Sequence, residues 1–211
     1  ISGGTITAGR LGIWNFSSDK YTSLGTVNEI SGGTIAGTTA AIRLNNYDVD
    51  YLNKSADTIT NKASAKVTAG NINGALEVGS ATELSISGGY FTANPTSYLV
   101  SGKDAVASNQ DGYQYMVGTL ALSQQTLALT KGGEAVLSVN AEPWGAVPAS
   151  AVSWSSDNEA VAAVDNGTVT AAAPGTATIT AEVNGKSLTC SVTVSYAGVD
   201  GISLDRSALT L

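Results

Sequence analysis

One six-residue motif recurs through the first half of the chain and constrains its fold more than any other feature. Ile-Ser-Gly-Gly-Thr-Ile occupies positions 1–6 and returns unchanged at positions 30–35. Positions 86–91 read Ile-Ser-Gly-Gly-Tyr-Phe, and positions 67–72 read Val-Thr-Ala-Gly-Asn-Ile. The copies therefore begin at Ile1, Ile30, Val67 and Ile86, at unequal intervals. This spacing is too irregular for a rigid helical repeat and fits stacked coils with loops of variable length.

The motif places apolar side chains at both ends of a glycine bend. Gly adopts positive φ and lets a neighbouring backbone approach closely, while Thr and Ile favour strands. A single coil cannot bury its own apolar positions, so stacked copies would bury them as ladders along one axis. The motif therefore predicts a parallel β-helix over residues 1–118, in which residues 92–117 form the cap of the open end.

The pattern changes after residue 118. Short alternating apolar runs recur about every ten residues, and the Asp-Asn-Gly at 165–167 and the Val-Asn-Gly at 183–185 are hairpin signals. These features predict a β-sandwich over residues 119–197, with Trp154 in its core. Residues 202–211 repeat the apolar pattern of residues 120–129. We therefore expect residues 198–211 to be the first strand of a further, truncated sandwich, and the chain to be a piece of a longer protein.

Charge and composition exclude several functions. The chain has 17 acidic and 10 basic residues, no basic cluster and no histidine. Clustered Lys and Arg are needed for phosphate contacts, so nucleic-acid binding is disfavoured. Catalysis by Ser-His or Cys-His pairs is excluded, and a lone Cys190 without histidine cannot build a zinc site. Cys190 lies in an alternating apolar run, which predicts a buried thiol. No segment is apolar enough to span a bilayer, and no cofactor is predicted.

Residues 120–196 resemble the bacterial immunoglobulin-like domain of group 2. The resemblance rests on LALTKGGEAVLSV, on VSWSSDNEAVAAVDNGTVTAAAPGTATITA and on CSVTV, in that order. It implies tandem extracellular modules on a bacterial surface protein. Residues 1–118 look like the ISGGTF-rich solenoids of surface proteins from gut-type bacteria, within the pectin-lyase-like right-handed β-helix class. The irregular spacing and the long insert at residues 10–29 depart from that pattern.

Aromatic side chains in the inserts and loops are the candidate ligand contacts, because a ring offers a large apolar face beside a polar handle. Trp14 and Tyr21 lie in the first insert, Tyr47 and Tyr51 lie in the second, and Trp144 lies in a loop of the sandwich. The alternative is that the rings of the inserts cover the edge of the solenoid and that Trp144 packs on its own domain.

Asp48 and Asp50 form the best local acidic pair, since residues two apart share one side of a strand. They are weak candidates for a metal site, or for the acidic site of a polysaccharide lyase or hydrolase. The alternative is that both are solvated side chains at a coil corner. The pair alone supplies too few oxygen ligands for calcium.

These features together predict an all-β chain: a right-handed parallel β-helix followed by an immunoglobulin-like sandwich. We expect a non-catalytic, monomeric fragment of an extracellular bacterial surface or secreted protein of the adhesin type. Its solenoid would bind a host or microbial surface glycan or protein, and the sandwich would act as a spacer. Two alternatives stay open, a carbohydrate-active β-helix enzyme and a purely structural stalk. No nucleic-acid partner and no membrane insertion are expected.

Overall fold

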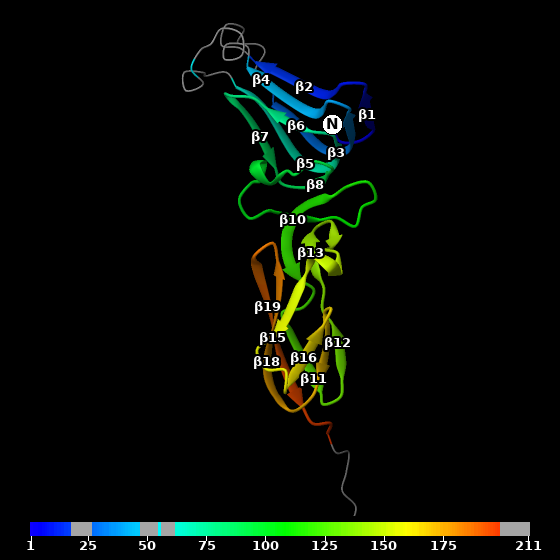
Figure 1. Cartoon of the computed structure of the whole chain (residues 1–211), viewed down its shortest axis with the longest axis vertical. Coiled ribbons are helices and arrows are strands. Elements are labelled where there is room, and N and C mark those ends of the chain that lie inside the picture. Colours follow the sequence, from blue (N-terminus) through cyan, green and yellow to red (C-terminus); the bar gives the residue numbers. More distant parts are fainter. Residues whose placement is uncertain (18–26, 47–54, 56–61, 199–211) are drawn as a thin grey trace, which may run out of the picture. The chain divides into compact units, whose positions relative to one another are not determined.

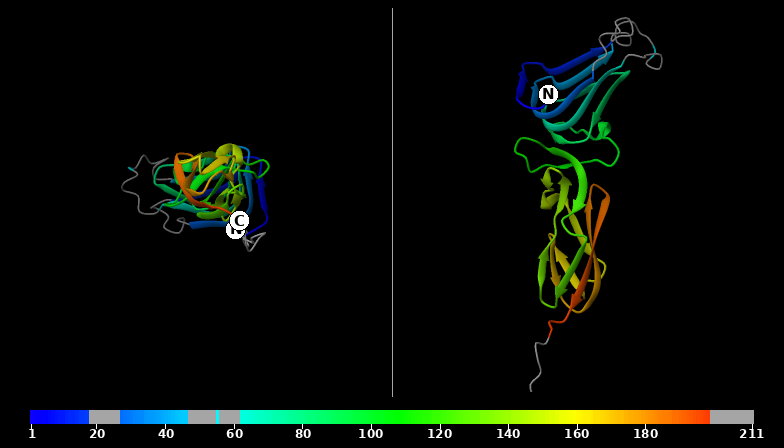
Figure 2. Two further views of the ribbon diagram at one scale, coloured as in Figure 1. Left: turned by 90° about the horizontal axis from the view of Figure 1, so that it is seen from below. Right: turned by 180° about the vertical axis from the view of Figure 1, so that it is seen from behind.

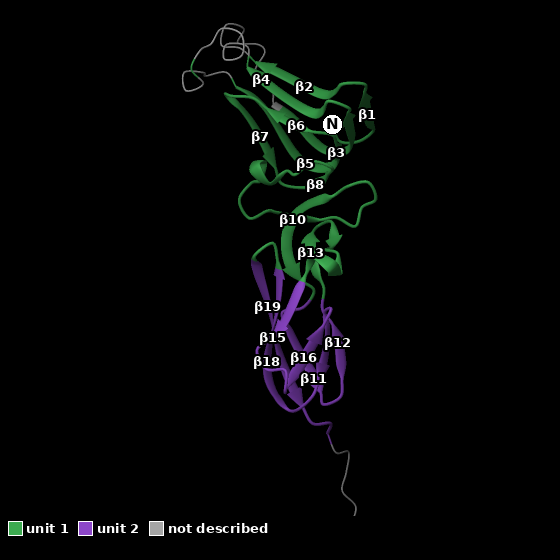
Figure 3. Cartoon of the chain, in the orientation of Figure 1, with its two compact units in different colours: residues 1–123, 138–152, 183–185 green, residues 124–137, 153–182, 186–211 purple. Residues whose placement is uncertain are grey.

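The computed structural model describes residues 1–17, 27–46, 55 and 62–198, and these are built from strands and short 3-10 helices (Figure 1). The chain divides into two compact units (Figure 3). Unit 1 comprises Ile1–Ser123, Ser138–Val152 and Val183–Gly185, and unit 2 comprises Gln124–Leu137, Ser153–Glu182 and Lys186–Leu211.

Unit 1 begins with strands that pair in parallel, which we call the parallel stack (Figures 1 and 2). Its first sheet has the order β1-β3-β5-β8, with β7 also paired to β5, and its second sheet has the order β2-β4-β6. The bounds are β1 Thr5–Ala8, β2 Leu11–Ser17, β3 Val27–Gly37, β4 Ala40–Asn46, β5 Ala63–Asn73, β6 Leu76–Val78, β7 Thr82–Ile86 and β8 Gly89–Phe91.

The four motif copies lie on neighbouring strands and in register. Two rows of register partners, which we call the motif rows, run across these strands. The last motif positions form the row Ile6–Ile35–Ile72–Phe91, and the first motif positions form the row Ile30–Val67–Ile86. Every pair of neighbours in these rows joins equivalent positions of two successive copies. The predicted ladders of stacked motif copies are therefore confirmed.

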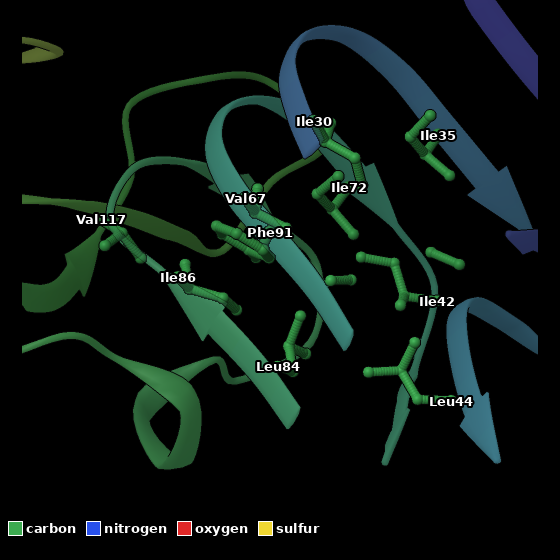
Figure 4. Packing of buried hydrophobic residues seen from close by; sticks show 12 residues of the cluster. Ile30, Ile35, Ile42, Leu44, Val67, Ile72, Leu84, Ile86, Phe91 and Val117 are labelled. Atoms are coloured by element: carbon green, nitrogen blue, oxygen red, sulfur yellow. The ribbon is translucent and has the colours of Figure 1, made fainter. Parts of the chain in front are cut away.

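The core of the parallel stack lies between its two sheets. Both motif rows contribute to one buried cluster, in which they meet Ile42 and Leu44 of β4 (Figure 4). Ile30, Ile35 and Ile72 are completely buried. Burying one such side chain stabilises a fold by about 1.5–3 kcal/mol. The repeated isoleucines thus hold the strands together and also fix which face of each strand points outward.

Glycine at the fourth motif position is required for two reasons. Gly4, Gly33, Gly70 and Gly89 all have positive φ, from 76° to 113°, a region that other residues rarely adopt. A Cβ on Gly33 would also lie 2.5 Å from the carbonyl oxygen of Gly4 in the copy before it. The bends of successive copies therefore stack backbone against backbone, with no space for a side chain.

Strand β10 (Tyr115–Leu122) follows the stack after the 3-10 helix η2 (Thr96–Tyr98) and strand β9 (Asp104–Ala107). Its first half pairs antiparallel with β8 and β9, and its second half pairs with β13 (Val139–Glu142). Strand β13 pairs in turn with β14 (Gly145–Ala146), which the 3-10 helix η3 (Ala149–Ala151) follows. The predicted boundary at residue 118 falls inside β10.

Unit 2 holds the strands of two further sheets, with the orders β11-β19-β18-β15 and β12-β17-β16. Their inward residues alternate with outward ones, as expected for an immunoglobulin-like domain. The bounds are β11 Thr126–Thr130, β12 Glu134–Val136, β15 Ser153–Ser156, β16 Ala162–Asp165, β17 Thr168–Ala171, β18 Gly175–Val183 and β19 Lys186–Ser195.

Both predicted hairpin turns are confirmed. Asn166 and Gly167 connect β16 to β17, and Asn184 and Gly185 connect β18 to β19. All four residues have positive φ, between 47° and 84°. This is the backbone that a two-residue hairpin turn requires and that Asn-Gly adopts readily.

Trp154 differs from the prediction that it lies in the sandwich core. It is only half-buried, and a Cβ on Gly167 would lie 3.2 Å from its ring. The reason is its position on β15, one of the two edge strands of the four-stranded sheet. An edge strand has a neighbour on one side only, so a large ring there is covered only in part.

The glycine bends provide a matched pair of substitutions. Gly3 and Gly32 occupy the same motif position, but a Cβ on Gly3 would meet nothing within 4 Å, whereas one on Gly32 would lie 2.5 Å from the carbonyl oxygen of Ser2. We expect Gly32→Ala to lower the free energy of unfolding by about 1–3 kcal/mol, and Gly3→Ala to leave it nearly unchanged. Chemical denaturation of both variants checks this. Equal effects of the two substitutions would contradict the stacked bends.

Cys190 is completely buried in β19, as predicted. Burial raises the pKa of its thiol, so the reactive thiolate is scarcer at neutral and mildly alkaline pH than in an exposed cysteine. We expect a thiol reagent at mildly alkaline pH to label Cys190 only after denaturant is added. Labelling of the native protein as fast as of a free cysteine would contradict this burial.

Candidate functional site

The outward face of the sheet β2-β4-β6 carries the candidate site, which we call the Trp14 face. Side chains alternate along β2, so Ile13 and Asn15 point inward while Trp14 and Phe16 point outward. Arg43 and Asn45 of β4 and Glu77 of β6 face outward in the same way. Trp14 pairs with Arg43, and Arg43 pairs with Glu77.

Trp14 is the most exposed tryptophan of the described residues, with 57% of its surface accessible. Its Nε1–H donates a hydrogen bond to Oδ1 of Asn45 over 3.1 Å. The ring also meets Phe16 edge-on, with 6.0 Å between the ring centres. These two contacts orient an exposed ring that would otherwise rotate freely.

Arg43 and Glu77 form an ion pair beside Trp14. Their side chains are 27% and 38% exposed, so the pair lies at the surface and adds little to stability. The two charges offset each other and leave this part of the face without a strong field. The pair also borders an open hollow of about 380 Å³, which is lined by Arg43, Leu44, Asn45, Glu77, Val78 and Gly79.

Polar side chains on the inner side hold the ends of β2 and β4 in place. Asn46 donates a hydrogen bond to the hydroxyl of Ser17 over 3.0 Å, and both residues are completely buried. The side-chain amide of Asn15 donates to the carbonyl of Ser64 over 2.8 Å. Buried polar groups that are paired in this way rigidify a fold, so the strands that carry Trp14 and Asn45 are anchored from behind.

Trp144 lies elsewhere in unit 1, between β13 and β14, and is half-buried. Its ring meets that of Tyr90 edge-on at 5.5 Å. Tyr90 also lies 6.4 Å from Tyr113, and burial raises the pKa of the Tyr113 hydroxyl. Trp144 therefore packs on Tyr90, outside the predicted sandwich of residues 119–197, and not on its own predicted domain.

The remaining predicted site residues cannot be placed. The aromatic candidates Tyr21, Tyr47 and Tyr51 and the acidic pair Asp48 and Asp50 lie outside the described residues. Among residues 1–17, 27–46, 55 and 62–198, no three acidic, histidine or cysteine side chains gather in a group that could hold a metal ion. No helix in this part of the chain is long and apolar enough to cross a membrane.

Sequence reasoning alone does not single out Asn45 or Glu77. A usable signal exists for Arg43, because Arg43 follows Trp14 at the same interval as Ile30 follows Ile1. The next step fails, because Glu77 follows its partner Arg43 more closely than Val67 follows Ile30. Fewer residues separate Ile72 from Glu77 than separate their register partners Ile35 and Arg43, and the motif spacing does not record this.

Comparison with known proteins identifies one part of the chain. Residues 116–194 match the model of the bacterial Ig-like domain (group 2), which confirms the resemblance seen in residues 120–196. A solved structure of domains 5–6 of the S-layer protein SbsC is 25% identical to the chain over the matched region, with a TM-score of 0.33. That match covers 38% of this chain and 45% of the other, less than half the length of either. No curated protein matches the chain.

Proposed function

We propose that the chain is a non-catalytic part of an extracellular bacterial surface or secreted protein, of the adhesin type, and that its Trp14 face binds a surface glycan. The Ig-like domain then acts as a spacer. The exposed, oriented ring of Trp14 beside polar side chains is the observation that supports binding most directly. The group 2 Ig-like match at residues 116–194 supports the extracellular location, because such domains are typical of surface proteins.

In this proposal the parallel stack consists of the last coils of a right-handed β-helix. Two parallel sheets, with motif copies in sequence order and in register, support this assignment. Parallel strands joined by a crossover are right-handed in nearly all proteins. The coils would present a continuous outward face whose residues come from successive repeats.

The chemistry of the Trp14 face suits a saccharide. A sugar ring has an apolar face of C–H groups, which packs on an indole ring, and hydroxyls that both donate and accept hydrogen bonds. Arg43 offers donors, Glu77 offers acceptors and Asn45 offers both within the same hollow. Because the Arg43–Glu77 pair has no net charge, a neutral glycan is favoured over a strongly anionic one.

The chemistry of the Trp14 face does not distinguish a host glycan from a microbial one. A glycan-array screen does. We expect the protein to act as a monomer, without a cofactor and without a nucleic-acid partner. Its net charge of −7 disfavours phosphate-rich ligands.

The test is a glycan-array screen of the whole chain beside three variants. We expect a specific glycan whose binding weakens about tenfold or more in Trp14→Ala, and also weakens in Glu77→Gln. Tyr196→Ala is the control, because it removes an exposed aromatic side chain outside the proposed face. Circular dichroism should show that Trp14→Ala stays folded, since an exposed ring contributes little to stability.

Two results would overturn the proposal. Glycan binding that survives Trp14→Ala unchanged would place the site elsewhere on the chain. Silence of the wild-type chain across the array and across a panel of host proteins would leave the chain as a structural stalk.

A further inference from the structure

The segment of residues 138–152, which we call the hairpin segment, belongs to the family-matched region but packs within unit 1. It contains β13, β14 and η3. Strand β10 joins it to the parallel stack, because the same strand pairs first with β8 and then with β13. The hydrogen-bonded sheet β1-β3-β5-β8-β10-β13-β14 therefore runs without a break from the first motif copy into the hairpin segment.

Gly118 marks the point where β10 changes partner. Its backbone lies so close to β13 that a Cβ would be 2.7 Å from the carbonyl oxygen of Glu142 and 2.8 Å from the carbonyl carbon of Ala141. The preceding residue, Val117, is completely buried in the core cluster of the stack. Adjacent residues of one strand thus pack against the stack and against the hairpin segment.

Trp144 makes a second contact between the hairpin segment and the last motif copy. The Tyr90 hydroxyl donates a hydrogen bond to the Trp144 carbonyl over 3.2 Å, and the two rings meet edge-on. A Cβ on Gly88 would lie 2.9 Å from the Trp144 ring. A Cβ on Gly88 would also lie close to the carbonyl oxygen of Thr68 in the copy before it. Gly88 therefore packs against both the backbone of that copy and the indole ring.

Packing holds the Trp144 ring in place without help from its polar atom. Its Nε1–H is buried and finds no hydrogen-bond partner among the described residues, which is unfavourable. A buried donor without an acceptor persists only where the contacts of the ring outweigh that cost. Trp144→Phe would keep much of the ring contact and remove the unpaired donor.

Side-chain amides make a third set of contacts at the same end of the stack. Asn109 donates to the carbonyl of Ala146 in β14 over 3.0 Å. Asn184, in the turn 183–185 that also belongs to unit 1, donates to the carbonyl of Ala105 in β9 over 2.9 Å. Segments far apart in the family-matched region thus both contact the residues that follow the last motif copy.

We propose that the hairpin segment is the cap of the parallel stack, so that the Ig-like region completes the fold before it instead of being an independent module attached to it. Residues 92–117, the cap predicted from the sequence, supply only the first layer of this closure. Without the hairpin segment, the second half of β10 would lose its pairing with β13, whereas the first half would stay paired with β8 and β9. The freed half would be an open sheet edge, which invites pairing with other chains. This inference does not depend on glycan binding.

The test is hydrogen–deuterium exchange of the full chain, read peptide by peptide. We expect Trp144→Ala to accelerate amide exchange roughly tenfold in β5 and β8. Both strands lie outside the hairpin segment that carries the substitution. Trp14→Ala is the matched control, because it removes an exposed tryptophan of the same unit and should leave β5 and β8 protected. Trp144→Phe should lie close to the wild type.

Acceleration confined to residues 138–152, with β5 and β8 as protected as in the wild type, would overturn the proposal, because the hairpin segment would then be an appendage. If Trp144→Ala does not fold, Tyr90→Phe and Asn109→Ala are judged by the same criterion. Each removes a single hydrogen bond to the hairpin segment, and each should accelerate exchange in β8 before exchange in the edge strand β1 changes.

Discussion

Backbone stacking of the glycine bends is the constraint on which the rest of the first unit depends. The fourth-position glycines have positive φ, and Gly33 lies against Gly4 too closely for any side chain. This contact fixes how far one motif copy is displaced from the next. It therefore places the apolar motif residues of each copy beside those of the previous one, where all members of the two motif rows except the partly buried Ile6 are completely buried. Register, core and outward faces all follow from it.

The Trp14 face illustrates that dependence. Trp14 lies beside Arg43 because their strands keep the same offset as the first two motif copies. Asn15, the inward neighbour of Trp14, is buried and hydrogen-bonded, and so are Ser17 and Asn46 at the ends of the same two strands. The outward side chains therefore project from strands that are held on their other side. A binding face of this kind needs no mobile loop to position it, because the core positions it.

Much of this arrangement is predictable from the sequence. Identical motifs at known positions predict which residues pair, and the two Asn-Gly signals predict their hairpins. Glu77 is not predictable, because fewer residues separate it from the last position of its motif copy than separate Arg43 from the same position in the copy before. Trp154 is less buried than predicted, since a sequence pattern does not reveal that its strand lies at a sheet edge. For Trp144 the sequence predicts a ligand contact or packing on the sandwich, and it does not reveal the partner Tyr90, which is far away in the chain.

The most direct test of this account is a disulfide scan between equivalent positions of the motif copies. Thr5 and Thr34 are register partners on neighbouring strands, where backbones are about 4.8 Å apart, within reach of a disulfide. Asn71 lies one strand further from Thr5. Mild oxidation should crosslink Thr5→Cys/Thr34→Cys and leave Thr5→Cys/Asn71→Cys reduced. A crosslink in the second pair but not in the first would contradict stacking of the motif copies in sequence order.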